Sequence, residues 1–159
     1  MTMSAKLLVQ NCISAKLAVN WDQFKSGEAE KIEYVSIGEG LVVFVCFREG
    51  ATEDILPKIA SSILNGKLYQ TDGKPKSVES DVEKSILIIP QATLGGKLKG
   101  KQVQYHGNIS KLDGKKIFER FQDILKRESK ETECKFGKYG NRQVLQMDTV
   151  GPFSHIFEF

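Results

Sequence analysis

Few side chains in this 159-residue sequence could carry out nucleophilic or metal chemistry. His106 and His155 are the only histidines, and neither lies in a GxSxG or cysteine-centred motif, so we expect neither to act as a catalytic base. Cys12, Cys46 and Cys134 are widely spaced and form no CxxC pair, which argues against a disulfide framework or a zinc site. Since HExxH, DxDxDG and phosphate-binding glycine motifs are also missing, we expect no metal and no cofactor. Any catalytic groups should therefore be backbone amides, a hydroxyl or groups of the substrate itself.

The positive charge of the chain is concentrated in one segment. Six lysines face a single acid between residues 95 and 116, whereas the net charge of the whole chain is only +3. Tyr105 and His106 could stack on bases while Lys97, Lys99 and Lys101 contact phosphates, a combination typical of single-stranded RNA binding. The alternative is an ordinary solvated lysine-rich surface.

The elements that must position these residues follow from the hydrophobic pattern. Alternation over residues 7–19 predicts a half-buried strand, and the continuous apolar run 40–47 predicts a central strand covered on both faces. Apolar residues at helical spacing predict helices over 54–65 and 113–127. Further strands are expected near 31–37, 85–89, 142–147 and 153–159. We expect one α+β domain over residues 1–159, a largely antiparallel twisted sheet or partial barrel covered by two helices.

No segment has the character of a membrane span or a secretory signal. The longest apolar run covers residues 41–47, far short of the roughly 20 residues that cross a bilayer, and the first residues lack a long apolar stretch. We therefore expect a cytoplasmic protein with no membrane partner.

Two segments together resemble the signature regions of the D-aminoacyl-tRNA deacylase family. Residues 88–106 include PQATLGG, and residues 138–159 include YGNRQV followed by a Gly-Pro turn. The family pattern is Ser-Gln-x-x-Leu at a strand end and Gly-Pro-x-Thr near the C-terminus. Here Pro90 stands in place of Ser, Ala92 in place of a bulky residue, Arg142 in place of Met and Ser154 in place of Thr. These departures resemble the animal-type branch of the family, and the family fold is the DTD-like fold.

The resemblance implies a proofreading hydrolase that acts at the 3′ acceptor end of mischarged tRNA. For the animal-type branch it implies removal of L-Ala from tRNA(Thr) as well as D-amino acids from D-aminoacyl-tRNAs. An aminoacyl ester is already activated, so an oxyanion hole of backbone amides and a placed water could suffice without a triad or cofactor. The site residues expected from it are Gln91, Ala92 and Thr93 as catalytic, and Leu94, Tyr139, Arg142, Gly151, Pro152, Phe153 and Ser154 as substrate-binding. With tRNA as the substrate, the lysine-rich segment supplies Lys97, Lys99, Lys101, Tyr105 and His106 as the expected tRNA-binding residues.

The resemblance further implies a homodimer in which the Gly-Pro turn of one subunit enters the site of its partner. An independent reason is the apolar last strand, because Phe153, Phe157 and Phe159 share one face and would leave an exposed edge in a monomer. A non-catalytic RNA-binding module is the main alternative function, and a small-molecule esterase is a third.

The Gly151–Pro152 peptide bond is expected to be trans, as in the animal-type branch. A trans bond would turn the Gly151 carbonyl away from the pocket and leave room for a small L side chain. Arg142, with its fork of donors, is expected to support the turned-out carbonyls.

Overall fold

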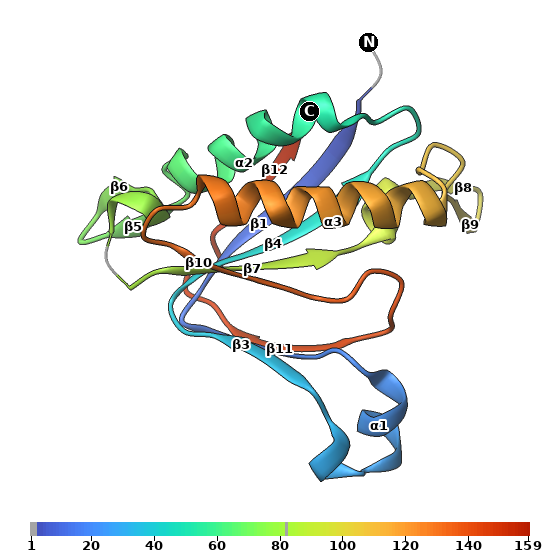
Figure 1. The fold of residues 1–159 in the computed structure, drawn as a ribbon, viewed down its shortest axis with the longest axis horizontal. Helices are drawn as coiled ribbons and strands as arrows, with labels where there is room; N and C mark the ends of the chain where they lie inside the picture. Colours follow the sequence, from blue (N-terminus) through green and yellow to red (C-terminus); the bar gives the residue numbers. More distant parts are fainter. Residues whose placement is uncertain (1–2, 82) are drawn as a thin grey trace.

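A five-stranded mixed sheet organises the chain and passes behind the two longer helices in Figure 1. The computed structural model describes residues 3–81 and 83–159. The strand order is β10-β7-β4-β1-β12, with β7 parallel to both β4 and β10, and β1 antiparallel to both β4 and β12. The strands are β1 (Ala5–Cys12), β4 (Gly40–Phe47), β7 (Ser85–Pro90), β10 (Glu133–Phe136) and β12 (Ser154–Glu158).

A second, three-stranded antiparallel sheet packs against one face of the five-stranded sheet. Its strand order is β11-β2-β3. Its strands are β2 (Ser14–Ala18), β3 (Tyr34–Ile37) and β11 (Val144–Asp148). The chain also forms two small hairpins, one of β5 (Tyr69–Thr71) and β6 (Lys74–Lys76), the other of β8 (Lys97–Lys99) and β9 (Gln102–Gln104). The described strands form separate sheets and no closed barrel.

Two amphipathic helices, α2 (Leu56–Asn65) and α3 (Lys111–Glu128), cover the five-stranded sheet on the side away from β2 and β3 (Figure 1). Pro57 lies in the first turn of α2, where its missing N–H is not needed. Ser110 caps α3 by accepting a hydrogen bond from the Asp113 amide at 3.2 Å. No helix of the described part of the chain is long and apolar enough to cross a membrane.

The strand β4 lies between two hydrophobic cores, which explains its unbroken apolar sequence. One face packs with α2 and α3 through Val43 and Val45, together with Phe118 and Phe121. The opposite face carries Val42 into the core shared with the three-stranded sheet. The predicted central strand, the two predicted helices and the α+β class are therefore confirmed.

Residues 7–19 form two strands rather than the single predicted one. The chain leaves the first sheet at Ile13, whose side chain is 54% exposed, and continues as β2 in the second sheet. The alternation survives this break because β1 buries Ala5, Leu7 and Val9 in the core under the helices, and β2 buries Ala15 and Leu17 in the core between the two sheets. The sequence analysis also missed the short helix α1 (Trp21–Ser26), β10 and both small hairpins.

Candidate active site

The segment from Gln91 to Gly95, here called the 91–95 turn, begins where β7 ends. The Gln91 amide donates to the Val45 carbonyl at 2.8 Å, after which the chain leaves the sheet and forms a 3₁₀ turn (Ala92–Gly95). Ala92 and Thr93 are exposed, and their backbone amides donate no hydrogen bond to any described residue. Two neighbouring unpartnered amides can stabilise the oxyanion of an acyl-transfer intermediate.

The Thr93 hydroxyl is oriented by the first residue of the turn. Its oxygen accepts a hydrogen bond from Nε2 of Gln91 at 2.8 Å, so its own proton remains available to a substrate or water. The Leu94 amide closes the turn on the Gln91 carbonyl at 3.3 Å, and the Leu94 side chain is half-buried. The structure thus brings the four predicted residues of this motif into one short turn.

Three side chains support the 91–95 turn from below. Nδ2 of Asn108 donates to the Ala92 carbonyl at 2.8 Å, and the Cys46 thiol lies 3.7 Å from the same oxygen. Tyr139, from the C-terminal part of the chain, lies under the 91–95 turn and lines a cavity of about 20 Å³ with Cys46, Ala92 and Asn108. Burial raises the pKa of both the Cys46 thiol and the Tyr139 hydroxyl, so both stay protonated at neutral pH. Cys46, which is buried, is therefore not an activated nucleophile.

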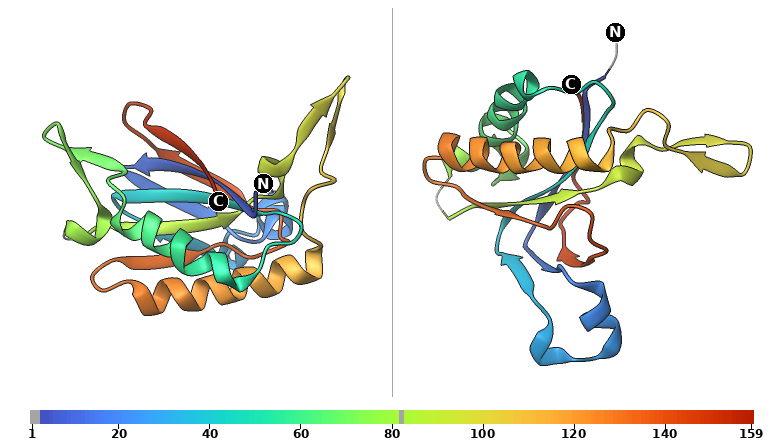
Figure 2. Two further views of the ribbon diagram at one scale, coloured as in Figure 1. Left: turned by 90° about the horizontal axis from the view of Figure 1, so that it is seen from above. Right: turned by 45° about the vertical axis from the view of Figure 1, so that its right-hand side comes forward.

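The predicted tRNA-binding lysines lie on the hairpin β8–β9, here called the lysine arm, which projects away from the rest of the molecule in both views of Figure 2. Lys97, Lys99 and Lys101 are all exposed. Tyr105, 42% exposed, and His106 follow β9 at the base of the arm. The arm leaves directly from the 91–95 turn, so cationic side chains lie next to the candidate site.

The Gly-Pro turn lies on a different side of the fold. Gly151 lines a cleft of about 380 Å³ together with Asn11, Gly40 and Phe153. The Thr149 hydroxyl lies 2.6 Å from Oδ1 of Asn11 and 2.7 Å from its carbonyl oxygen, which ties the turn to the end of β1.

Within one chain the two predicted motifs do not meet. Gly151 shares its cleft with Gly40, at the beginning of β4, whereas Gln91 is bonded to Val45 near the end of the same strand. At about 3.3 Å per residue, Gly40 and Val45 are about 17 Å apart. Ser154 begins β12, paired with Gln10, and also remains far from the 91–95 turn.

The Gly151–Pro152 peptide bond is cis, so the prediction of a trans bond was wrong. An X–Pro bond prefers trans by only about 0.5–1 kcal/mol. Because this preference is so small, the local sequence alone does not decide between the cis and the trans isomer. The expectation of L-alanine acceptance therefore no longer rests on this bond. Arg142 lies at the far end of β11 from Gly151, with its guanidinium 5.2 Å from the centroid of the Trp21 ring, and within one chain it does not support the Gly151 carbonyl.

The two histidines hold positions that suit packing or surface contact. His155 packs edge-to-face against Phe153, at a centroid distance of 4.9 Å, and stacks on Phe157, at 5.9 Å. His106 is exposed. In the described ranges, no group of three or more His, Cys, Asp or Glu side chains is arranged to hold a metal ion.

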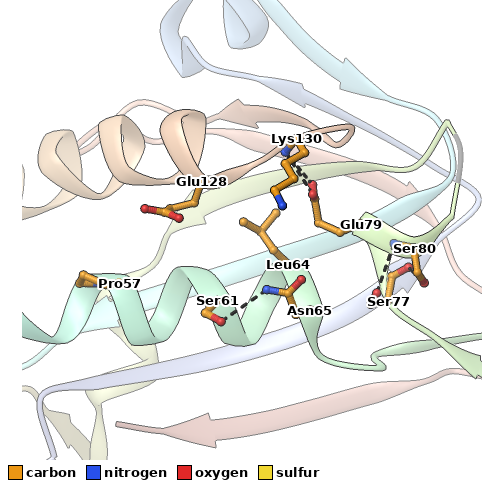
Figure 3. Close-up of a pocket in the computed structure, with 9 residues that line it drawn as sticks. All are labelled: Pro57, Ser61, Leu64, Asn65, Ser77, Glu79, Ser80, Glu128 and Lys130. Carbon is orange, nitrogen blue, oxygen red and sulfur yellow. Dashed lines mark hydrogen bonds between the residues drawn. The ribbon is translucent and has the colours of Figure 1, made fainter.

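A separate cleft of about 500 Å³ opens between α2, the turn at residues 77–80 and the end of α3 (Figure 3). The Glu79 carboxylate within it accepts hydrogen bonds from the backbone amides of Lys130, at 3.1 Å, and Thr132, at 3.2 Å. These bonds fix the connection from α3 to β10, and the cleft contains none of the predicted site residues. We assign Glu79 a structural role.

The sequence analysis missed Asn108, Arg48 and Asn11. Asn108 and Arg48 hold the 91–95 turn, and Asn11 holds the Gly-Pro turn. The available signals were an asparagine within the lysine-rich segment and a charged residue directly after a buried strand, and both patterns are common at strand ends and turns.

The D-Tyr-tRNA(Tyr) deacylase family matches residues 8–158. The chain is 42% identical over 164 residues to D-aminoacyl-tRNA deacylase 2 of Danio rerio, covering 99% of this chain and all of that one. It is also 42% identical to D-aminoacyl-tRNA deacylase 2 of Homo sapiens, covering 98% of this chain and 95% of the human one.

A solved structure described as a probable eukaryotic D-amino acid tRNA deacylase superposes with a TM-score of 0.81 at 26% identity, covering 99% of this chain and 100% of that one. The DTD-like fold expected from the sequence is therefore confirmed. The matched residues include both the 91–95 turn and the Gly-Pro turn. This chain belongs to the D-Tyr-tRNA(Tyr) deacylase family.

Proposed function

We propose that this protein is an aminoacyl-tRNA deacylase that hydrolyses the ester bond of mischarged tRNA at its 3′ acceptor end. The observation that carries this proposal is the pair of unpartnered amides at Ala92 and Thr93, beside an oriented hydroxyl. The relatives named D-aminoacyl-tRNA deacylase 2 support D-aminoacyl-tRNAs as substrates. From the resemblance, L-Ala-tRNA(Thr) is proposed as a second substrate.

The chemistry needs little beyond what the 91–95 turn offers. Water attacks the ester carbonyl carbon, and the amides of Ala92 and Thr93 donate to the oxyanion that forms. The bond from this carbon to the 3′-oxygen of the terminal adenosine then breaks. The proton that the water loses passes to that oxygen through the adjacent 2′-OH, so the products are the free amino acid and a tRNA with its 3′-OH restored. The Thr93 hydroxyl, held by Gln91, positions the water or the substrate amino group.

The lysine arm is proposed to bind the tRNA backbone. Lys97, Lys99 and Lys101 supply three positive charges beside the 91–95 turn, and Tyr105 and His106 offer surfaces for base stacking. Contacts of this kind would bring the single-stranded acceptor end to the two free amides.

The active unit is proposed to be a homodimer, because one chain places its Gly-Pro turn too far from its own 91–95 turn. A second copy can insert Gly151 and Pro152, together with Phe153 and Ser154, beside Thr93 and Leu94 of the first. A monodisperse 17.8 kDa species at micromolar concentration would contradict this proposal.

Complementation tests the shared site directly. Thr93→Ala removes the oriented hydroxyl from one copy, and Pro152→Ala alters the inserted turn of the other. After random reassociation of equal amounts, half of the dimers are mixed and each carries one intact composite site, so about a quarter of the parent activity should return. If each chain built its own site, mixing would restore nothing.

The decisive assay measures amino acid released from D-aminoacyl-tRNA and from L-Ala-tRNA(Thr), with the matching correctly charged L-aminoacyl-tRNA as control. Release above the uncatalysed rate from either mischarged substrate supports the proposal. Binding of tRNA without release would favour the alternative, a non-catalytic RNA-binding module. Equal turnover of aminoacyl esters that lack the tRNA body would favour a small-molecule esterase.

Two further expectations remain proposals. We infer that residues 1–159 form one domain, supported by the family match over residues 8–158. A cytoplasmic location is supported by the three cysteines, all of which are free. Limited proteolysis and cell fractionation, respectively, test them.

A further inference from the structure

Arg48 is buried directly beneath the 91–95 turn. It follows the last residue of β4 and is only 9% exposed. Its Nη1 donates to the Gly95 carbonyl at 2.8 Å and to Oδ1 of Asn108 at 2.5 Å. Within the described ranges, no Asp or Glu side chain forms a salt bridge with it. Burying a guanidinium without a carboxylate is costly unless its donors are hydrogen-bonded, so these two bonds offset part of the cost of its burial.

The guanidinium packs against both ends of the segment that carries the lysine arm. A Cβ placed on Gly95 would lie 2.2 Å from Nη1 of Arg48, and a Cβ placed on Gly107 would lie 2.1 Å from Nη2. Real side chains do not approach this closely, so Arg48 occupies the space that a side chain would need at Gly107, and Arg48 and Asn108 together occupy that space at Gly95. Arg48 therefore contacts the chain where it enters the arm and where it returns.

Asn108 extends this contact to the candidate catalytic residues. Its side chain accepts from Arg48 through Oδ1 and donates to the Ala92 carbonyl through Nδ2. The backbone around it is fixed to the end of β4, because the backbone amide of Glu49 donates to the Gly107 carbonyl at 2.8 Å. A continuous chain of hydrogen bonds thus runs from the strand, through Arg48 and Asn108, to the residue that precedes Thr93.

We propose that Arg48 is a positioning residue that holds the 91–95 turn and the base of the lysine arm in one fixed arrangement. This inference rests on the proposed function. RNA bound by the arm then presents its ester to the amides of Ala92 and Thr93, because the two parts share one buried anchor. Loss of Arg48 should lower the rate of hydrolysis and leave the affinity for tRNA nearly unchanged, since the lysines themselves remain.

The test compares Arg48→Met, Arg48→Lys and a control, Arg120→Met. Methionine keeps most of the buried length without the donors, and Arg120 is an exposed arginine whose Nε lies 3.3 Å from Oε1 of Glu53. For Arg48→Met we expect the single-turnover rate constant to fall about tenfold or more, with the dissociation constant for uncharged tRNA within about twofold of the parent value. Arg48→Lys should recover part of this loss because its ammonium can still reach one of the two oxygens, and Arg120→Met should match the parent.

Three results would overturn the assignment. They are an unchanged rate in Arg48→Met, a loss of tRNA affinity as large as the loss of rate, and equal losses in the methionine and lysine variants. If Arg48→Met does not fold, Asn108→Ala replaces it, because this change removes the link from Arg48 to the Ala92 carbonyl and should produce the same pattern.

Amide hydrogen exchange of residues 91–96, measured in the same proteins, does not depend on activity. Exchange of the Gly96 amide, which donates to the Thr93 carbonyl at 3.1 Å, should accelerate about tenfold in Arg48→Met, while exchange in α2 stays the same. A parent protein that releases no amino acid would refute the proposed function, and the exchange measurement would still decide the role of Arg48. Unchanged exchange in this segment would reject that role.

Discussion

Gly114 in the first turns of α3 offers a test of how the helix and the candidate site are packed together. An alanine Cβ at this position would lie 2.0 Å from the Tyr139 hydroxyl oxygen and 2.7 Å from the ring carbon that carries it. Tyr139 cannot easily move away, because its ring packs on Phe118 at a centroid distance of 5.6 Å and lines the cavity under Ala92. We therefore expect Gly114→Ala to destabilise the protein although alanine favours helices.

The magnitude follows from two opposing effects. Replacing glycine by alanine inside a helix stabilises it by up to about 1 kcal/mol. Overpacking of a well-filled interior typically costs about 1–3 kcal/mol. The difference is a net loss of about 1 kcal/mol, which lowers the melting temperature of a domain of this size by about 2–4 °C.

The assay is urea unfolding followed by circular dichroism, carried out as a double-mutant cycle with Tyr139→Leu. A leucine is too short to meet the new methyl group, so Gly114→Ala should become stabilising in that background. The coupling between the two positions should then be about 2 kcal/mol. Gly38→Ala is the control, because a Cβ there meets nothing within 4 Å and should change little. Equal stabilisation by Gly114→Ala in both backgrounds would refute the packing argument.

Three further predictions concern the site and its surroundings. Thr93→Ala should lower the rate of deacylation and leave tRNA binding intact; an unchanged rate would assign catalysis to the backbone amides alone. Replacing Lys97, Lys99 and Lys101 by glutamine should weaken tRNA binding and reduce the slope of log K against log salt by about 2, at about 0.7 per lost phosphate contact. An unaltered slope would instead support the alternative that the arm is an ordinary solvated surface. Burial acts to raise the pKa of Glu79, but the backbone amides that bind its carboxylate hold that pKa below its usual value. Its stabilising effect is therefore present above pH 4.5 and lost as the pH falls through the lowered pKa. The melting temperature of Glu79→Gln should lie below that of the parent at pH 7, and the gap should close in acid; a constant gap from pH 7 to pH 3 would contradict this reasoning.

Much of the fold could be predicted because buried positions carry apolar residues at a regular spacing in the sequence. The run 40–47 indicated a strand buried on both faces, and β4 does separate the two cores. The spacing of Ile117, Phe118 and Phe121 placed the buried face of α3 correctly. Periodicity could not show the break at Ile13, because the strands on either side both bury alternate residues, in different sheets. The short helix α1 has no buried residue and therefore no such spacing.

Part of the candidate site could likewise be predicted from the sequence, and part could not. The types and order of Gln91, Ala92, Thr93 and Leu94 pointed to the turn, since a short motif is local and its chemistry lies in its own backbone and one hydroxyl. Tertiary structure alone placed Tyr139 under Ala92 and Arg48 under Gly95, across separations of 47 residues in each case, because contacts between distant segments depend on how the strands are ordered.

The conformation and surroundings of the Gly-Pro turn were also decided by the tertiary structure. The sequence by itself determined that a Gly-Pro pair precedes the last strand, but not that its bond is cis, because the two isomers of an X–Pro bond differ by less free energy than the surrounding packing supplies. Nor did it determine that the turn lies at the opposite end of β4 from Gln91. That separation follows from the direction in which each strand runs through the sheet, which only the folded chain defines.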